Sequence, residues 1–155
     1  KMEPRAASPR ERLETVRVLS EAGVPTLVMV APIVPGLTDR ETPAILEAAA
    51  EAGASGASYV LLRLPHQIKA LFLDWLKREF PDRAGRVESL IRQTRGGQLY
   101  DSRFGVRQRG EGPVAEQIRQ QFQVFARRYG LSGRIEPLSS DAFRHPAPDG
   151  QLGLF

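Results

Sequence analysis

Two kinds of hydrophobic pattern alternate in the first part of the chain. Apolar side chains recur at helical spacing over 13–22, and an apolar run without polar alternation then covers 26–31. The same order returns as an alanine-rich helical segment at 45–52 and a second apolar run at 57–64. Strands that are apolar on both faces are typical of parallel sheets covered by helices, so we expect both faces of 26–31 to be buried. The pattern predicts an α/β fold.

The residues at the helix boundaries support this interpretation. Ser8 and Glu11 have the spacing of a capping box at the start of the first helix. Thr38 and Glu41 repeat that spacing, which predicts a second capping box after the first strand.

A short repeat indicates how these elements are organised. The tripeptide Glu-Ala-Gly ends both helical segments, at 21–23 and at 51–53, which predicts two copies of one helix–strand unit. Parallel strands joined by a helix need a right-handed crossover, and two such strands alone leave both edges of the sheet unpaired. We therefore expect the neighbouring strands to belong to another part of a longer protein.

Three further helices are predicted after the second strand. Apolar stripes at 68–76 and 87–91 indicate two helices that we expect to cover the sheet, and a third helix begins at Pro113 and ends at Gly130. Between them, 95–113 is rich in glycine and irregular.

The resulting organisation has three parts. We predict β/α units over 1–95, a basic loop and a C-terminal helix over 96–130, and an extended tail over 131–155.

Composition narrows the class of protein. With 41% hydrophobic and 26% charged residues, the 155-residue chain is typical of a globular protein. No apolar run in the chain approaches the roughly 20 residues that a membrane span needs. The first residues lack the apolar core of a secretion signal and do not begin with methionine, so we expect a cytoplasmic fragment of a longer chain. The absence of cysteine excludes disulfides, thiolate metal sites and cysteine nucleophiles from these residues.

The positive charge is concentrated in one segment. The chain has a formal net charge of +4, and 92–109 contains five arginines against a single acid, Asp101. Glycines and aromatic residues accompany these arginines, a composition that suits phosphate contact and base stacking. The nucleic-acid-binding candidates are Arg95, Tyr100, Arg103, Arg107 and Arg109. The alternative is a solvated loop that packs back on the domain.

The ends of the two predicted strands are the places to expect a ligand. Ligands of parallel sheets bind at the carboxyl ends of the strands, here 31–35 and 63–66. Arg63 follows four apolar residues, so it either contacts a ligand or forms a structural ion pair with a carboxylate such as Glu3. The alternative for 31–35 is an ordinary strand-to-helix loop that binds no ligand. His66 and His145 are isolated, and no metal site is predicted.

With these motifs described, the chain resembles the carboxyl-terminal half of the photolyase-like radical S-adenosylmethionine proteins, relatives of spore photoproduct lyase. The resemblance spans nearly the whole chain. The matching segments are 2–6, 31–39, 62–65, 95–97, 100–102 and 104–105.

The resemblance implies a fold and a chemistry. Members have a partial (β/α)6 barrel in which a three-cysteine loop binds a 4Fe-4S cluster, and the cluster cleaves S-adenosylmethionine to a 5′-deoxyadenosyl radical. This chain lacks the cysteine loop and the early strands, so the fragment alone is expected to bind no cofactor and to be inactive. The resemblance implies adenosine packing by Ala31, Pro32 and Ile33, with polar or substrate contacts from the residues Glu3, Arg5 and Arg63.

The last five residues resemble the short motif by which bacterial DNA-repair and replication proteins bind the sliding clamp. Gln151 would form directional hydrogen bonds, while Leu152, Leu154 and Phe155 would fill an apolar pocket. The alternative is a tail whose apolar end packs on the domain.

Three functions follow from these observations. The first is the later part of a radical S-adenosylmethionine enzyme of the DNA repair photolyase-like group, a lyase-like activity on nucleic acid, with the missing N-terminal half of the same protein as its partner. The second is a non-catalytic binding module brought to DNA by the clamp-type tail. The third is a (β/α) metabolic domain without radical chemistry.

Overall fold

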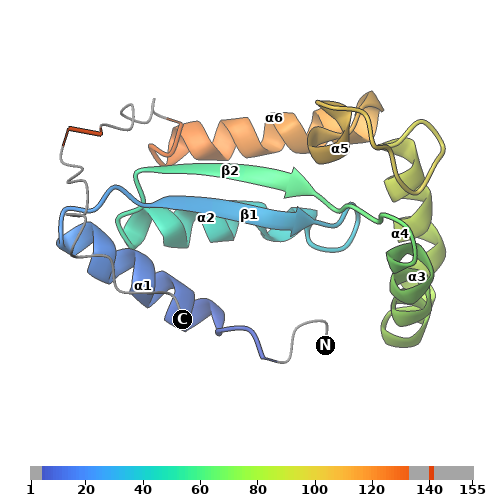
Figure 1. Ribbon diagram of the computed structural model, residues 1–155, viewed down its shortest axis with the longest axis horizontal. Coiled ribbons are helices and arrows are strands. Elements are labelled where there is room, and N and C mark those ends of the chain that lie inside the picture. Colours follow the sequence, from blue (N-terminus) through green and yellow to red (C-terminus); the bar gives the residue numbers. More distant parts are fainter. Residues whose placement is uncertain (1–4, 133–139, 142–155) are drawn as a thin grey trace, which may run out of the picture.

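The computed structural model describes residues 5–132 and 140–141. Its centre is a two-stranded sheet in which β1 (Leu27–Ile33) and β2 (Gly56–Leu61) run parallel. The helix α2 (Thr42–Glu51) makes the crossover between them, after the short 3-10 turn η1 (Asp39–Glu41). Figure 1 shows both strand arrows pointing the same way. The α/β fold and the parallel pairing are therefore confirmed.

The first helix, α1 (Pro9–Glu21), begins as predicted. Ser8 Oγ accepts from the Glu11 backbone N–H, and the Glu11 carboxylate accepts from the Ser8 N–H, completing the capping box. No α1 residue is buried. A hydrogen bond from Ser20 Oγ to the carbonyl of Gly53 connects α1 to the end of α2.

The second predicted capping box is wrong. Thr38 precedes η1 but makes no side-chain cap. Its hydroxyl instead accepts a hydrogen bond from the Val34 N–H at 2.9 Å, closing the turn after β1. The 3-10 turn separates Thr38 from α2, which starts at Thr42 with Pro43 in its first turn. The Thr38 hydroxyl, four residues after Val34, therefore accepts from the turn that follows β1 and not from the helix.

One face of the sheet carries the main core. Helices α2 and α6 (Gly112–Arg128) pack on it, and the cluster joins Val30 and Tyr59 of the strands to Leu46, Ile118 and Phe122 of the helices. The Tyr59 and Phe122 rings lie 4.8 Å apart. The helix predicted from Pro113 to Gly130 is confirmed as α6.

The opposite face of β1 differs from our expectation. Leu27 and Met29 are about half exposed, at 50% and 57%, so β1 is buried on one face only. Within the described residues, no further strand or helix covers this face. An apolar strand face without a covering layer is a surface that a longer protein would be expected to occupy.

Helices α3 (Ile68–Glu79) and α4 (Pro81–Gln93) occur at the predicted positions but do not cover the sheet. Figure 1 places this pair beyond the arrowheads of the strands. They form a second core with Val34, Leu37, Leu62 and Leu64, residues that follow the strands. The prediction of sheet-covering helices was wrong because their apolar stripes pack on each other and on these loops.

The segment after α4 is mostly irregular, as predicted, with one short helix, α5 (Val106–Arg109). No helix in the described part of the chain has the length and apolar character to cross a membrane. Most of the predicted tail, 133–139 and 142–155, lies outside the described residues.

Candidate functional site

The carboxyl end of β1 contains a bulge. Val30 pairs with Tyr59 and Ile33 with Leu61, so β1 has one residue more than β2 between these pairs. The bulge holds Ala31 and Pro32, joined by a cis peptide bond, and both residues are exposed. Bulges often occur beside binding sites because they redirect neighbouring side chains.

Only part of the predicted adenosine-packing trio is accessible. Ala31 and Pro32 face solvent, whereas the Ile33 side chain is 1% exposed and belongs to the main core. The assignment of Ile33 as a ligand contact is therefore corrected. Because of the extra residue in the bulge, Ile33 lies on the same face of β1 as Val30. Residue spacing alone did not predict this position.

An apolar groove of about 1040 Å³ runs along β1. It is lined by Leu13 and Val16 of α1, by Ala31 and Pro32, and by Ile45 of α2, among others. The groove follows the edge of β1 to which no described strand is hydrogen-bonded. Its volume is sufficient for a ligand of nucleoside size.

The polar residues predicted beside this groove are only partly described. Arg63, two residues after β2, is exposed, and it forms no ion pair with a described carboxylate. Arg5 is exposed as well, while its neighbour Glu3 lies outside the described residues. Arg63 is therefore accessible to a ligand, and the alternative ion pair with Glu3 stays a prediction.

Arg95 is the most deeply buried charged residue of the site. Its side chain is 1% exposed, Nη2 donates to the Leu62 carbonyl at 3.0 Å, and Nη1 donates to the Val106 carbonyl. Burial lowers the pKa of Arg95, an effect that the nearby Asp101 charge opposes. Because the guanidinium is enclosed and bonded to backbone, the prediction that Arg95 contacts nucleic acid is wrong. It attaches the loop 96–110 to the end of β2.

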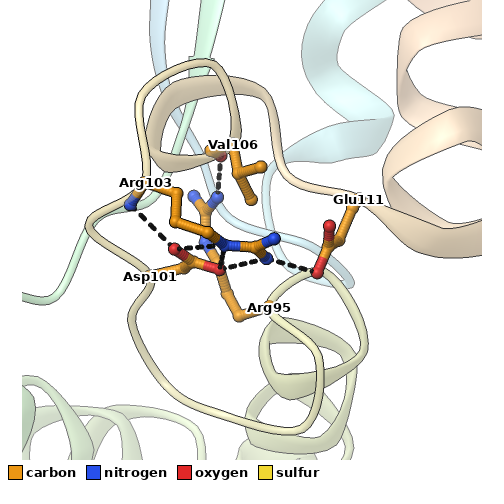
Figure 2. Close-up of polar contacts among 5 residues, drawn as sticks. All are labelled: Arg95, Asp101, Arg103, Val106 and Glu111. Carbon is orange, nitrogen blue, oxygen red and sulfur yellow. Dashed lines mark hydrogen bonds and ion pairs between the residues drawn. The ribbon is translucent and has the colours of Figure 1, made fainter.

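Arg103 lies at the centre of a small ion-pair network (Figure 2). Its Nη2 is 2.6 Å from an Asp101 carboxylate oxygen and 2.8 Å from a Glu111 oxygen. Asp101 also accepts from the Arg103 backbone N–H. Hydrogen bonds from Arg103 lower the pKa of Asp101, and the same contacts raise the pKa of Arg103. The two carboxylates thus offset the Arg103 charge, which leaves it less available to a phosphate than we predicted.

The remaining cationic residues of the loop lie over aromatic rings. The Arg107 guanidinium is 5.4 Å from the Phe104 ring centre, and that of Arg109 is 4.1 Å from the Tyr59 ring centre. Arg109 also donates to Ser58 Oγ at 2.9 Å. Tyr100 is half-buried. Of the predicted set, Arg107 and Arg109 pair with no carboxylate of the described residues.

The sequence interpretation placed Phe104 in the basic segment with its aromatic residues but did not list it as a site residue. Its side chain is 90% exposed, the most exposed large apolar residue described, and Arg107 lies over it. Its position beside Gly105 in a basic loop was the available signal, because core residues seldom sit in such a context.

Several predicted residues cannot be placed. Gln151, Leu152, Leu154 and Phe155 lie outside the described residues. Within 5–132 and 140–141, no group of histidines and acids has the arrangement of a metal site.

Comparisons with known proteins give distant relatives. An uncharacterized protein of Mycobacterium tuberculosis and one of Mycobacterium bovis are each 30% identical over 132 residues, which is 84% of this chain and 35% of theirs. The chain thus spans about a third of the length of the curated relatives it matches. No family model and no solved structure matches.

Proposed function

We propose that this chain is the later part of a radical S-adenosylmethionine enzyme of the photolyase-like group, with a nucleic-acid substrate in a bacterial cytoplasm. The observation that carries the proposal is the exposed bulge of Ala31 and Pro32, which opens into an apolar groove at the carboxyl end of a parallel strand. In parallel α/β folds this is the position at which ligands bind.

In this proposal β1 and β2 are two neighbouring strands of a partial (β/α)6 barrel. Their parallel crossover supports it, and so does the edge of β1 with which no described strand pairs. The exposed Leu27 and Met29 would face the barrel interior, and α1, which buries no residue here, would pack on the preceding strand. The greater length of the relatives leaves room for the other strands.

Of the two cofactors that the proposal implies, S-adenosylmethionine and a 4Fe-4S cluster, the residues of this chain fit the first. Ala31 and Pro32 offer a small apolar surface to adenosine, and Arg63 and Arg5 are accessible to anionic groups. The chain has no cysteine, so none of these residues can ligate a 4Fe-4S cluster. The cluster would be held by another part of the longer protein, and we assign no step of its chemistry to this chain.

The nucleic-acid part of the proposal depends on the loop after α4. Phe104 offers an exposed ring for base stacking, and Arg107 and Arg109 offer charges for phosphates. Arg95 stabilises the conformation of this loop by hydrogen bonds to backbone carbonyls, and Arg103 does so by ion pairs with carboxylates.

The test uses the full-length protein that contains this sequence. After anaerobic reconstitution with iron and sulfide, a reducing assay with S-adenosylmethionine should yield 5′-deoxyadenosine. A failure to cleave the cofactor, with the cluster shown to be present by absorption spectroscopy, would reject the enzyme hypothesis.

A variant locates the cofactor on this chain. Ala31→Glu places a charge on the proposed adenosine surface, and we expect it to weaken S-adenosylmethionine binding by about tenfold or more. Ala22→Glu, at the exposed end of α1, makes the same chemical change outside the groove and should bind normally. Equal binding by both variants would remove Ala31 from the site.

A non-catalytic module recruited to DNA by the terminal pentapeptide is the second candidate. The sequence motif at 151–155 favours it, and it needs no cofactor.

A further inference from the structure

A second cleft lies on the helical side of the molecule and adjoins the groove of β1 at Arg40, which lines both. It has a volume of about 410 Å³ and lies where the loop after β1 meets α4 and α6. Its lining is rich in arginine and glutamine, with Arg40 from the loop, Arg83 and Arg86 from α4, and Gln117 and Gln121 from α6. Two carboxylates, Asp39 and Asp82, also line it.

The arginines of this cleft differ in what they bind. Arg83 Nη2 donates to the Gly36 carbonyl at 2.9 Å, a contact that fixes the loop against α4. Arg40 and Arg86 are exposed, and neither forms a hydrogen bond or ion pair with any described residue. Asp39 and Asp82 line the same cleft, yet no ion pair joins them to these arginines in the described part of the chain. The guanidinium groups are thus free to bind a ligand.

We propose that this cleft binds a phosphate group through Arg40 and Arg86. Guanidinium groups bind phosphate by paired, charge-assisted hydrogen bonds, and two of them from different elements can contact the group from two sides. The amides of Gln117 and Gln121, one helical turn apart, add neutral donors. Asp39 and Asp82 would accept from hydroxyl groups of the same ligand, which favours a phosphorylated sugar or nucleotide unit over bare phosphate.

Two sources share this chemistry, a small phosphate ester and the backbone of a nucleic acid. The site shares Arg40 with the groove of β1, whereas Arg86 lines the cleft alone and no residue of the loop 96–110 lines it. Phosphate binding in the cleft does not depend on the radical enzyme hypothesis. Neither the cluster nor S-adenosylmethionine is needed to test it.

The experiment titrates the full chain with inorganic phosphate, adenosine monophosphate and a short single-stranded oligonucleotide. Binding is followed by NMR at the side-chain amides of Gln117 and Gln121. We expect all three probes to shift these signals, and the double variant Arg40→Gln/Arg86→Gln to weaken binding by about tenfold or more. The control Arg10→Gln/Arg128→Gln removes the same charge from outside the cleft and should lose less than about twofold.

The probes also separate the two sources. Tighter binding of the oligonucleotide than of the monophosphate would assign the site to a nucleic-acid backbone, and the reverse order would assign it to a small ester. Equal losses in the two double variants would overturn the proposal, as would wild-type protein that shows no shift with any probe. Unchanged thermal denaturation of the variants, whose substituted side chains are exposed, verifies that the fold is intact.

Discussion

Arg95 donates a hydrogen bond from Nη2 to the backbone carbonyl of Leu62, 33 residues earlier in the chain, although its side chain is almost completely enclosed. The bond joins the basic loop to the end of β2. A second bond from the same guanidinium reaches the Val106 carbonyl, so one side chain sets the position of the loop relative to the sheet.

The first prediction concerns this contact. Arg95→Met removes the guanidinium and leaves the Leu62 and Val106 carbonyls without their donor, so we expect a loss of about 2–3 kcal/mol in the free energy of unfolding. Urea denaturation measures it. Arg10→Met, at an exposed position of α1, is the control. If both variants are equally stable, the contact does not hold the loop.

The second prediction is a pH dependence of the loop. Arg103 lowers the pKa of Asp101, so the contact stabilises the folded loop above the ordinary carboxyl pKa of about 3.9. The stabilisation is lost as pH falls through the lowered pKa. Carboxyl-detected NMR should show Arg103→Gln raising the pKa of Asp101, with weaker amide protection of 101–106 at neutral pH.

The control for this titration is a second pair on α6. Arg119 and Gln120 lower the pKa of Glu116 to about 2 by hydrogen bonds. Arg119→Gln should therefore raise the pKa of Glu116 and leave that of Asp101 unchanged. A common shift of both carboxyl groups in either variant would indicate a general charge effect.

The third prediction concerns the close packing after α5. Gly110 has a φ of +73°, and a methyl group there would lie 2.9 Å from Leu61 Cδ1 and 3.0 Å from the Thr94 carbonyl. Gly97 also has a positive φ, +86°, but open space around it. Both alanine variants carry backbone strain of roughly 1–3 kcal/mol. Gly110 combines its positive φ with a ψ of −178°, a conformation almost restricted to glycine, and is closely packed, so Gly110→Ala should lose about 1–3 kcal/mol more. Equal thermal denaturation midpoints would contradict the packing.

The fourth prediction tests nucleic-acid binding by the loop. Arg107→Gln/Arg109→Gln should weaken binding of a single-stranded oligonucleotide and reduce the slope of log affinity against log salt by roughly 1.4, the loss of two phosphate contacts. Fluorescence anisotropy at several salt concentrations measures both quantities. The charge-matched control Arg127→Gln/Arg128→Gln lies at the end of α6, and an equal effect there would mean nonspecific attraction.

The fifth prediction tests the terminal pentapeptide. Removing 151–155 should abolish binding to a bacterial sliding clamp, because Leu152 and Phe155 would supply the apolar contacts. Surface plasmon resonance with immobilised clamp measures the affinity. A chain with the same five residues in scrambled order should behave like the truncation, and full affinity without the pentapeptide would exclude the motif.

Part of the candidate site could be predicted because its signals are local. The strand end at 31–35 follows from an apolar run that meets Pro35 and Gly36, and the basic loop follows from its arginines. The burial of Arg95 and Ile33 could not be predicted in this way. Each depends on partners distant in sequence, the Leu62 carbonyl for the first and the α2 and α6 core for the second.

The cleft of Arg40 and Arg86 gave no sequence signal for the same reason. The two arginines are separated by 46 positions, and each alone resembles an ordinary surface residue. They line one cleft because the Arg83 to Gly36 contact fixes the loop after β1 against α4.

The sequence by itself determined the identity and direction of the strands and most helix ends, because hydrophobic period, prolines and glycines act over a few residues. The tertiary structure decided which face of β1 is covered, where α3 and α4 pack, and which arginines remain accessible. Those outcomes depend on contacts between segments that are distant in the sequence. Several surfaces and hydrogen-bond partners are available to each segment, and the local residue pattern does not indicate which of them it contacts in the folded protein.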